Sequence, residues 1–148
     1  MEGEQMIDIS TKQHVLRVCT AEGYLRLSEA ALEAIKRREV KKGDPIETAR
    51  TAALLAVKRT PELIPHCHPL PVTSVRVDID VADRVAVRCE VSTVYRTGVE
   101  MEALVGVSAA LLTLWDMVKY LEKDADGQYP HTRIEDIRVV RKVKGNGT

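Results

Sequence analysis

The sequence predicts an α+β fold in which helices cover one face of a single antiparallel sheet. Apolar and polar residues alternate over residues 75–81, and a turn at 82–84 leads into a second β-branched run, as in a hairpin of half-buried strands. A proline-free run rich in Ala and Leu, from residue 99 to about residue 123, predicts one long helix. A last strand is expected at 134–140. The order β-α-α-β-β-α-β fits two right-handed βαβ halves, and therefore a ferredoxin-like sheet.

The first strand and the first helix follow from the N-terminal quarter of the chain. β-Branched residues are frequent in residues 15–27, so we expect a strand there, with a bulge at Gly23. Ser28 can cap a helix from residue 29 to about residue 40, because its hydroxyl can accept a bond from a free N–H of the first turn. Lys42-Gly43 is expected to end this helix.

The second helix has a well-marked start and end. Asp44-Pro45-Ile46-Glu47 supplies a capping acid, a proline at the first helical position and a glutamate three residues after the cap. Thr60-Pro61 is expected to stop the helix near Arg59. Three prolines within residues 65–71 then exclude regular structure and display His66-Cys67-His68 on a stiff loop.

Composition limits the classes of function. The 148 residues, 45% of them hydrophobic, are expected to form one domain over 1–148. The 22 basic and 22 acidic residues cancel, so there is no general electrostatic attraction to nucleic acid or to a membrane surface. Cys19, Cys67 and Cys89 fit neither a disulfide framework nor a CxxC site. No signal peptide is recognisable, and Thr113 and Asp116 interrupt the apolar part of the long helix. We therefore expect a cytoplasmic protein.

The long helix carries a candidate acid and base. One of its stripes is polar at a period of 3.6 residues: Glu102, Thr113, Asp116, Lys119 and Lys123. Asp116 and Lys119 lie three residues apart and are neighbours on this stripe, so they could exchange protons with a bound substrate. The alternative is an ordinary solvated face of charged residues.

Three further features could bind a ligand. Lys42 precedes a helix N-terminus, where backbone N–H groups favour an anion, although a basic turn that only closes the preceding helix is the alternative. His66-Cys67-His68 offers zinc-type ligands without a third and fourth ligand at a matching spacing. We favour polar contact with a ligand, and leave open two histidines bonded only to backbone. Glu100 and Glu102 lie in the first turn of the long helix, where the dipole favours carboxylates in any case.

Four segments together resemble one known family. They are Lys42-Gly43-Asp44, the loop Leu63-Ile64-Pro65-His66-Cys67-His68-Pro69-Leu70, Thr97-Gly98-Val99-Glu100-Met101-Glu102-Ala103-Leu104, and Asp116-Met117-Val118-Lys119. With the opening Ile7-Asp8-Ile9-Ser10-Thr11-Lys12, they resemble the molybdenum-cofactor biosynthesis protein C family of cyclic pyranopterin monophosphate synthases. The likeness extends from Met6 to about Lys144.

The resemblance implies a lyase of molybdenum cofactor biosynthesis. In that family a cyclised dihydroguanosine triphosphate (3',8-cyclo-7,8-dihydro-GTP) becomes cyclic pyranopterin monophosphate, a pterin, with release of diphosphate. The family fold is ferredoxin-like, and the assembly is a homohexamer, a trimer of dimers with sites at subunit interfaces. No cofactor is implied, although a divalent cation can accompany the triphosphate.

Site residues follow from the resemblance by motif position. Asp116, Lys119 and Lys42 match catalytic residues. The substrate-binding residues would be His66, Cys67, His68, Glu100, Met101 and Glu102, with Arg17 near the phosphates and Lys142 as a late functional lysine. His66 stands where leucine is frequent and is expected to contribute backbone contacts, and the family's C-terminal KSGGKSG is here Lys142-Val143-Lys144-Gly145-Asn146-Gly147.

A rival class is a non-catalytic ferredoxin-like module that binds a nucleotide or another small molecule for regulation. Its support is the generic fold. Two ionisable clusters on separate elements are more than such a module needs. Release of diphosphate from the cyclised substrate would distinguish the two classes.

Overall fold

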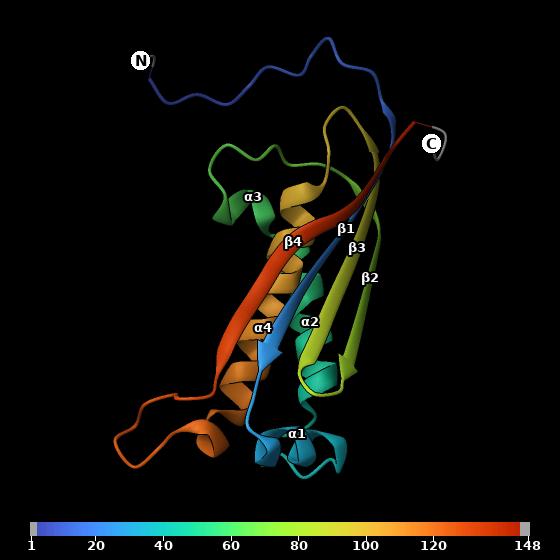
Figure 1. Cartoon of the computed structure of the whole chain (residues 1–148). Helices are drawn as coiled ribbons and strands as arrows, with labels where there is room; N and C mark the ends of the chain where they lie inside the picture. The colour runs from blue at the N-terminus through green and yellow to red at the C-terminus, as the bar shows by residue number, and fades with distance from the viewer. Residues whose placement is uncertain (1–2, 146–148) are drawn as a thin grey trace.

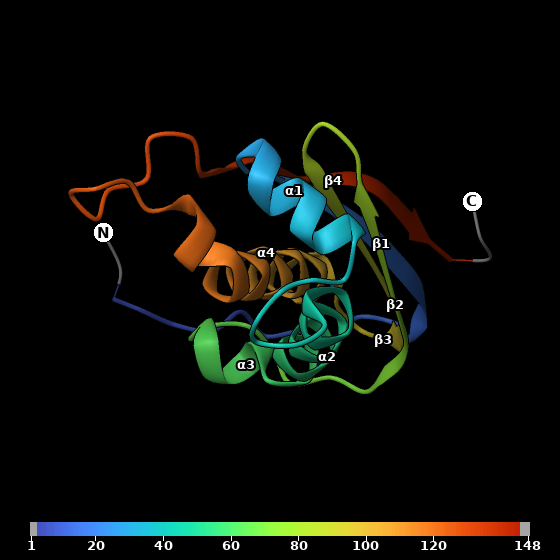
Figure 2. The same ribbon diagram turned by 90° about the horizontal axis from the view of Figure 1, so that it is seen from below.

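Four antiparallel strands form one sheet in the computed structural model, which describes residues 3–145. Their order in the sheet is β2-β3-β1-β4, where the strands are β1 (Val15–Arg26), β2 (Val72–Val81), β3 (Val85–Tyr95) and β4 (Arg133–Lys144). The helices are α1 (Glu29–Lys36), α2 (Pro45–Lys58), the short α3 (Thr60–Leu63) and α4 (Glu100–Glu122). They lie to one side of the sheet, with α2 and α4 side by side (Figures 1 and 2). The expected α+β fold is confirmed, with α3 as an addition.

The helix caps are those that the sequence predicts. The Ser28 hydroxyl accepts a hydrogen bond from the Ala31 N–H at 3.2 Å, and Asp44 accepts from the Ile46 N–H at 3.0 Å. The expectation that α1 extends to about residue 40 is wrong. Arg38 adopts a left-handed conformation, with φ 58°, and this ends the helix at Lys36. Residues 37–44 therefore form a separate loop, and this loop carries Lys42.

The core lies between the sheet and the pair α2 and α4. Two glycines allow α4 to lie close to its neighbours. A Cβ atom added at Gly106 would lie 2.9 Å from Cys89 Sγ and from Val57 Cγ2, and one added at Gly23 would lie 2.8 Å from Leu111 Cδ1. Because side chains at these positions would separate the layers, α4 is fixed tightly against β1, β3 and α2.

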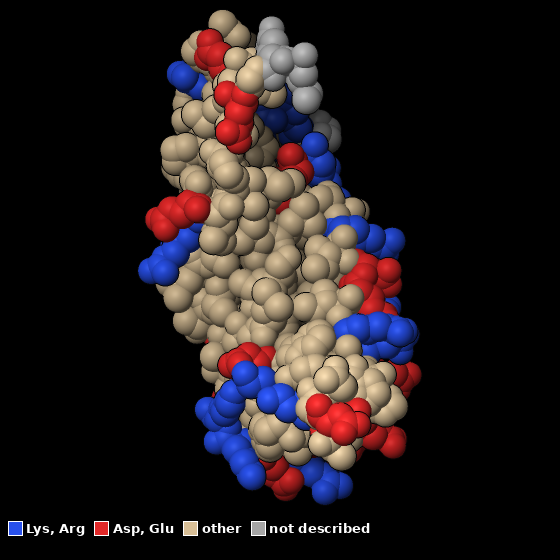
Figure 3. Space-filling model, turned by 90° about the vertical axis from the view of Figure 1, so that its left-hand side faces the viewer, with Lys and Arg blue, Asp and Glu red and all other residues tan. Residues whose placement is uncertain are grey.

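The central helix α4 has the length and apolarity of a membrane span, yet half of its most apolar stretch is buried inside the fold. It is the core helix of the domain. Its outward side is apolar as well, and Leu112 at its middle is 59% exposed. On that face, charged side chains leave the middle free and gather at the margins and at both ends (Figure 3). An exposed apolar face of this kind is typical of a surface that another protein covers.

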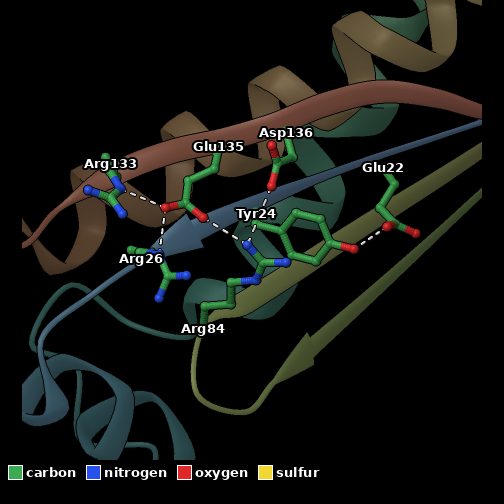
Figure 4. Close-up of polar contacts among 7 residues, drawn as sticks. All are labelled: Glu22, Tyr24, Arg26, Arg84, Arg133, Glu135 and Asp136. Atoms are coloured by element: carbon green, nitrogen blue, oxygen red, sulfur yellow. Dashed lines mark hydrogen bonds and ion pairs between the residues drawn. The ribbon is translucent and has the colours of Figure 1, made fainter.

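A polar network joins the lower ends of β1 and β4 to the hairpin turn (Figure 4). The carboxylate of Glu135 accepts from Arg26 Nε at 2.5 Å, Arg133 Nε at 2.6 Å and Arg84 Nη1 at 2.7 Å, while Arg84 stacks 3.5 Å above the Tyr24 ring. The bonds from Arg133, Arg26 and Arg84 lower the pKa of Glu135 to about 2.

The β1–β4 register shifts between Glu22 and Tyr24, which confirms the bulge expected at Gly23.

Candidate active site

The candidate residues form two clusters at opposite ends of α4. The lower cluster combines the 37–44 loop with the C-terminal half of α4, and consists of Lys42, Asp116 and Lys119. The upper cluster combines the first turn of α4 with the proline-rich loop, the start of β1 and the end of β4 (Figure 1). It consists of Arg17, His66, Cys67, His68, Glu100, Met101, Glu102 and Lys142.

In the lower cluster Asp116 lies between two lysines. Lys119 Nζ is 2.9 Å from Asp116 Oδ1, as the three-residue spacing predicts. Lys42 Nζ reaches across from the loop, donates to the backbone carbonyl of Asp116 at 2.9 Å and lies 3.6 Å from Asp116 Oδ2. A carboxylate and two ammonium groups thus share one site, drawn from segments 74 residues apart.

The charges in the lower cluster stabilise one another. The hydrogen bond from Lys119, with the charges of Lys119 and Lys42, lowers the pKa of Asp116. The bond to Asp116 raises the pKa of Lys119 in turn. The Asp116 side chain is 59% exposed, so the site is open on this chain. Asp116 is therefore an ionised acceptor of protons, and Lys119 a protonated donor.

In the upper cluster a buried carboxylate meets a thiol. Glu102 is 1% exposed, and the Cys67 thiol donates to Glu102 Oε2 at 3.3 Å. The other oxygen, Oε1, is the one buried side-chain polar atom without a hydrogen-bond partner in residues 3–145. A groove of about 310 Å³ opens beside the pair and is lined also by His66, His68 and Met101. A buried carboxyl group with one oxygen unpartnered is suited to receive a ligand.

Of the remaining candidates, Lys142 contacts Glu100, which lines this groove, and Arg17 contacts the end of β3. Lys142 Nζ lies 3.6 Å from Glu100 Oε1. Arg17 Nε donates to the carbonyl of Tyr95 at 3.2 Å. Of the C-terminal segment singled out by the resemblance, Asn146 and Gly147 lie outside the described residues.

The N-terminal segment also lines the groove, which the sequence motifs did not predict. His68 Nε2 is 2.6 Å from the carbonyl of Ile7, and Lys12 lies on the groove wall. His66 Nε2 is 3.0 Å from a carboxylate oxygen of Glu4. The likeness of residues 7–12 to the family's start was the one available signal.

Comparison with known proteins identifies the family of this chain. The MoaC family model matches residues 6–145. The chain belongs to the MoaC family. It is 57% identical over 142 residues to a protein of Archaeoglobus fulgidus named "Probable cyclic pyranopterin monophosphate synthase", covering 95% of this chain and 91% of that protein. Proteins of the same name from Thermococcus kodakarensis and Methanopyrus kandleri are each 54% identical, over 97% and 93% of this chain and 93% and 91% of their own.

The polar stripe that periodicity predicts on α4, through Glu102, Thr113, Asp116, Lys119 and Lys123, is not exposed along its whole length. Glu102 is instead enclosed beneath the proline-rich loop, while Asp116 is exposed. Fourteen residues separate them, which is about 21 Å along a helix axis. On one chain the two clusters are too far apart to touch the same reacting group.

The Cys67 thiol of the proline-rich loop stays protonated at neutral pH. Burial, with the nearby Glu102 carboxylate, raises the pKa of Cys67 to about 12. Within residues 3–145 no three His, Cys, Asp or Glu side chains group in a way that could hold a metal ion. The arrangement of His66-Cys67-His68 therefore gives no support to the zinc interpretation.

Glu102→Gln is expected to make the fold more stable at neutral pH. Burial raises the pKa of Glu102 above its ordinary value of 4.5, so the unfolded chain ionises first, and the folded state loses stability as the pH rises from 4.5 through the raised pKa. Glutamine keeps the acceptor for Cys67 and does not ionise. Thermal unfolding of variant and wild type should coincide near pH 4 and differ near pH 8, with the variant melting higher. A difference that does not change with pH would contradict this assignment.

Proposed function

We propose that this chain is a lyase that converts 3',8-cyclo-7,8-dihydro-GTP into cyclic pyranopterin monophosphate and diphosphate. Substrate and products balance without an oxidant or reductant, so the reaction requires no redox cofactor, and a divalent cation can accompany the triphosphate. The observation that carries the proposal is the placement of Asp116 between Lys42 and Lys119, in a chain that belongs to the MoaC family.

The chemistry suits these groups. Opening a guanine-derived ring and closing it as a pterin requires repeated proton transfers, which Asp116 as acceptor and Lys119 as donor can carry out. In the phosphate step a ribose-derived hydroxyl attacks the first phosphorus, the bond to the diphosphate breaks, and the hydroxyl proton passes to a base. We assign to Lys42 and Arg17 the role of stabilising the negative charge that develops on the phosphate oxygens.

The upper cluster is assigned to binding and positioning of the substrate. Glu102 Oε1, buried and unpartnered, can accept a hydrogen bond from the ring nitrogens of a purine or pterin. His68 and Lys142 add donors around the same groove. General acid–base groups must come within about 3 Å of the atoms they serve, so upper and lower clusters must meet for one substrate to use both.

We propose that two copies of the chain bring the clusters together. Ala109, half-buried on α4, lies seven residues from both Glu102 and Asp116 and three residues before the exposed Leu112. If two α4 helices pack antiparallel about a two-fold axis near Ala109, the upper cluster of each copy meets the lower cluster of the other. Small Ser108 and Ala109 permit a close approach there, and exposed Leu112 and Met101 become covered.

The same pairing accounts for the open lower cluster. Covering Asp116 with a second copy would exclude water and strengthen each charge interaction with the substrate. We propose a homohexamer, a trimer of such dimers, in the reducing cytoplasm, where Cys19, Cys67 and Cys89 stay as free thiols.

Diphosphate release tests the function. Purified protein is incubated with the cyclised nucleotide produced by the preceding radical enzyme, and diphosphate and pterin are both measured. The proposal expects the two products in equal amounts. A nucleotide-binding module would retain the substrate and release neither product, and this result would overturn the proposal.

Lys42→Ala is expected to lower kcat/KM by about 10- to 100-fold, the loss of one charge-assisted hydrogen bond. Because a cation has been removed from the phosphate site, added salt should weaken the remaining binding less steeply than in the wild type. Steady-state kinetics over a range of salt concentrations check both effects. Lys36→Ala, on the exposed side of α1, is the matched control. Equal rates and equal salt dependence in wild type and Lys42→Ala would remove Lys42 from the site.

A further inference from the structure

We infer that Tyr120 is a positioning residue that decides which lysine of the 37–44 loop reaches Asp116. For its catalytic consequence the inference rests on the proposed function. Tyr120 lies one helical turn after Asp116, on the same side of α4. Its hydroxyl accepts a hydrogen bond from the backbone N–H of Lys41 at 2.9 Å. The loop is thereby aligned with the stretch of α4 that carries the acid–base pair.

The loop carries two adjacent lysines, and one of them contacts Asp116. Lys41 and Lys42 differ in what they contact: Lys41 Nζ lies 5.4 Å from the centre of the Tyr120 ring, and Lys42 Nζ bonds to Asp116. The ring attracts the Lys41 ammonium through its π face. Tyr120 thus holds Lys41 by its backbone and by its side chain, and the next residue along the chain, Lys42, is directed to the site.

Other contacts hold the rest of the 37–44 loop. Arg38 and Gly43 both have positive φ, 58° and 121°, so the loop has no helical ladder to fix its peptide planes. Val40 is buried at 8% exposure and anchors one point, and the Gly43 N–H returns to the Val40 carbonyl at 3.2 Å. The start of the loop is tied to α1 by bonds from the Arg38 N–H to the Ile35 carbonyl at 3.2 Å and from the Glu39 N–H to the Ala34 carbonyl at 2.9 Å. The bond from the Lys41 N–H to Tyr120 attaches the part of the loop that carries the two lysines to α4.

The test is a double-mutant cycle on kcat/KM. Tyr120→Phe keeps the ring and removes the acceptor, and should lower kcat/KM by about three- to tenfold, the value of one hydrogen bond. In the Lys42→Ala background the same change should have no further effect, because Tyr120 acts through Lys42. Tyr24→Phe, which removes a hydroxyl bonded to Glu22 on the opposite face of the sheet, is the matched control and should leave kcat/KM unchanged.

A second readout does not depend on turnover. Lysines dimethylated with ¹³C-formaldehyde give separate NMR signals, and the Lys42 signal can be assigned with Lys42→Arg. Tyr120→Phe should move the Lys42 signal toward that of exposed lysines, and Tyr24→Phe should leave it in place. If the wild-type protein releases no diphosphate, the proposed function is wrong. The NMR measurement would still show whether Tyr120 determines the position of the Lys42 side chain.

Two results would overturn the inference. One is an unmoved Lys42 signal in Tyr120→Phe. The other is an equal loss of kcat/KM on Tyr120→Phe with Lys42 present and absent, since a general structural role would give that result. Thermal unfolding of each variant verifies that the compared proteins are folded.

Discussion

Asp116→Asn is expected to lower turnover by about 10²–10⁴-fold, the contribution of a general acid–base group. Asparagine keeps the size of the side chain and can still accept a bond from Lys119, but it takes up no proton from substrate. The fold should survive, because Asp116 is exposed and supports no buried contact. Single-turnover formation of the pterin, with substrate binding measured separately, distinguishes slower chemistry from weaker binding.

The pH dependence provides a second check on Asp116. Lys119 and Lys42 lower the pKa of Asp116 below the ordinary aspartate value of 3.8, so the carboxylate is ionised at and above that pH. The enzyme should therefore lose activity only when the pH falls through the lowered pKa. Asp83→Asn in the exposed hairpin turn is the control for the substitution itself. An Asp116→Asn enzyme that makes the pterin at nearly the wild-type rate would show that another group is the base.

Leu112→Asp is expected to abolish assembly and activity together. Leu112 is the most exposed leucine on α4, and a charge at that position would be buried unpaired between two antiparallel helices. Analytical ultracentrifugation and activity are measured on the same samples over a dilution series. Wild-type activity should fall at the concentration at which the assembly dissociates.

Leu112→Ala gives the graded comparison, since it removes apolar contact without adding charge. It should dissociate at a concentration between those of wild type and Leu112→Asp. A Leu112→Asp monomer with full activity would show that one chain supplies every catalytic residue. The apolar outward side of α4 would then need another explanation.

Much of the fold could be predicted because its signals are local. The cap at Asp44 and the proline after it mark the start of α2 within one residue, and alternation over residues 75–81 identifies β2. The end of α1 could not be predicted, since the left-handed turn at Arg38 has no glycine to announce it. The burial of Glu102 could not be predicted for a different reason: periodicity gives the face of a helix, and the proline-rich loop decides which part of that face is covered.

In the candidate site, too, the local contacts could be predicted and the contacts between distant segments could not. The pairing of Asp116 with Lys119 follows from their spacing on one helix, and the structure confirms it. Family resemblance placed Lys42 and Asp116 among the catalytic residues, and their contact across 74 residues follows from no local pattern. Tyr120 was missed because a tyrosine four residues after an aspartate has many ordinary explanations. Its role depends on which loop lies opposite, and only tertiary structure gives that.

The central claim is that one active site uses the upper cluster of one copy and the lower cluster of another. It is tested most directly by mixing two inactive variants, one with Asp116→Asn and one with His68→Ala and Glu102→Gln. Co-expressed in equal amounts, they should recover about a quarter of wild-type activity, because half of the two-fold dimers are mixed and each holds one intact site. Activity no higher than that of the two variants alone would contradict the claim.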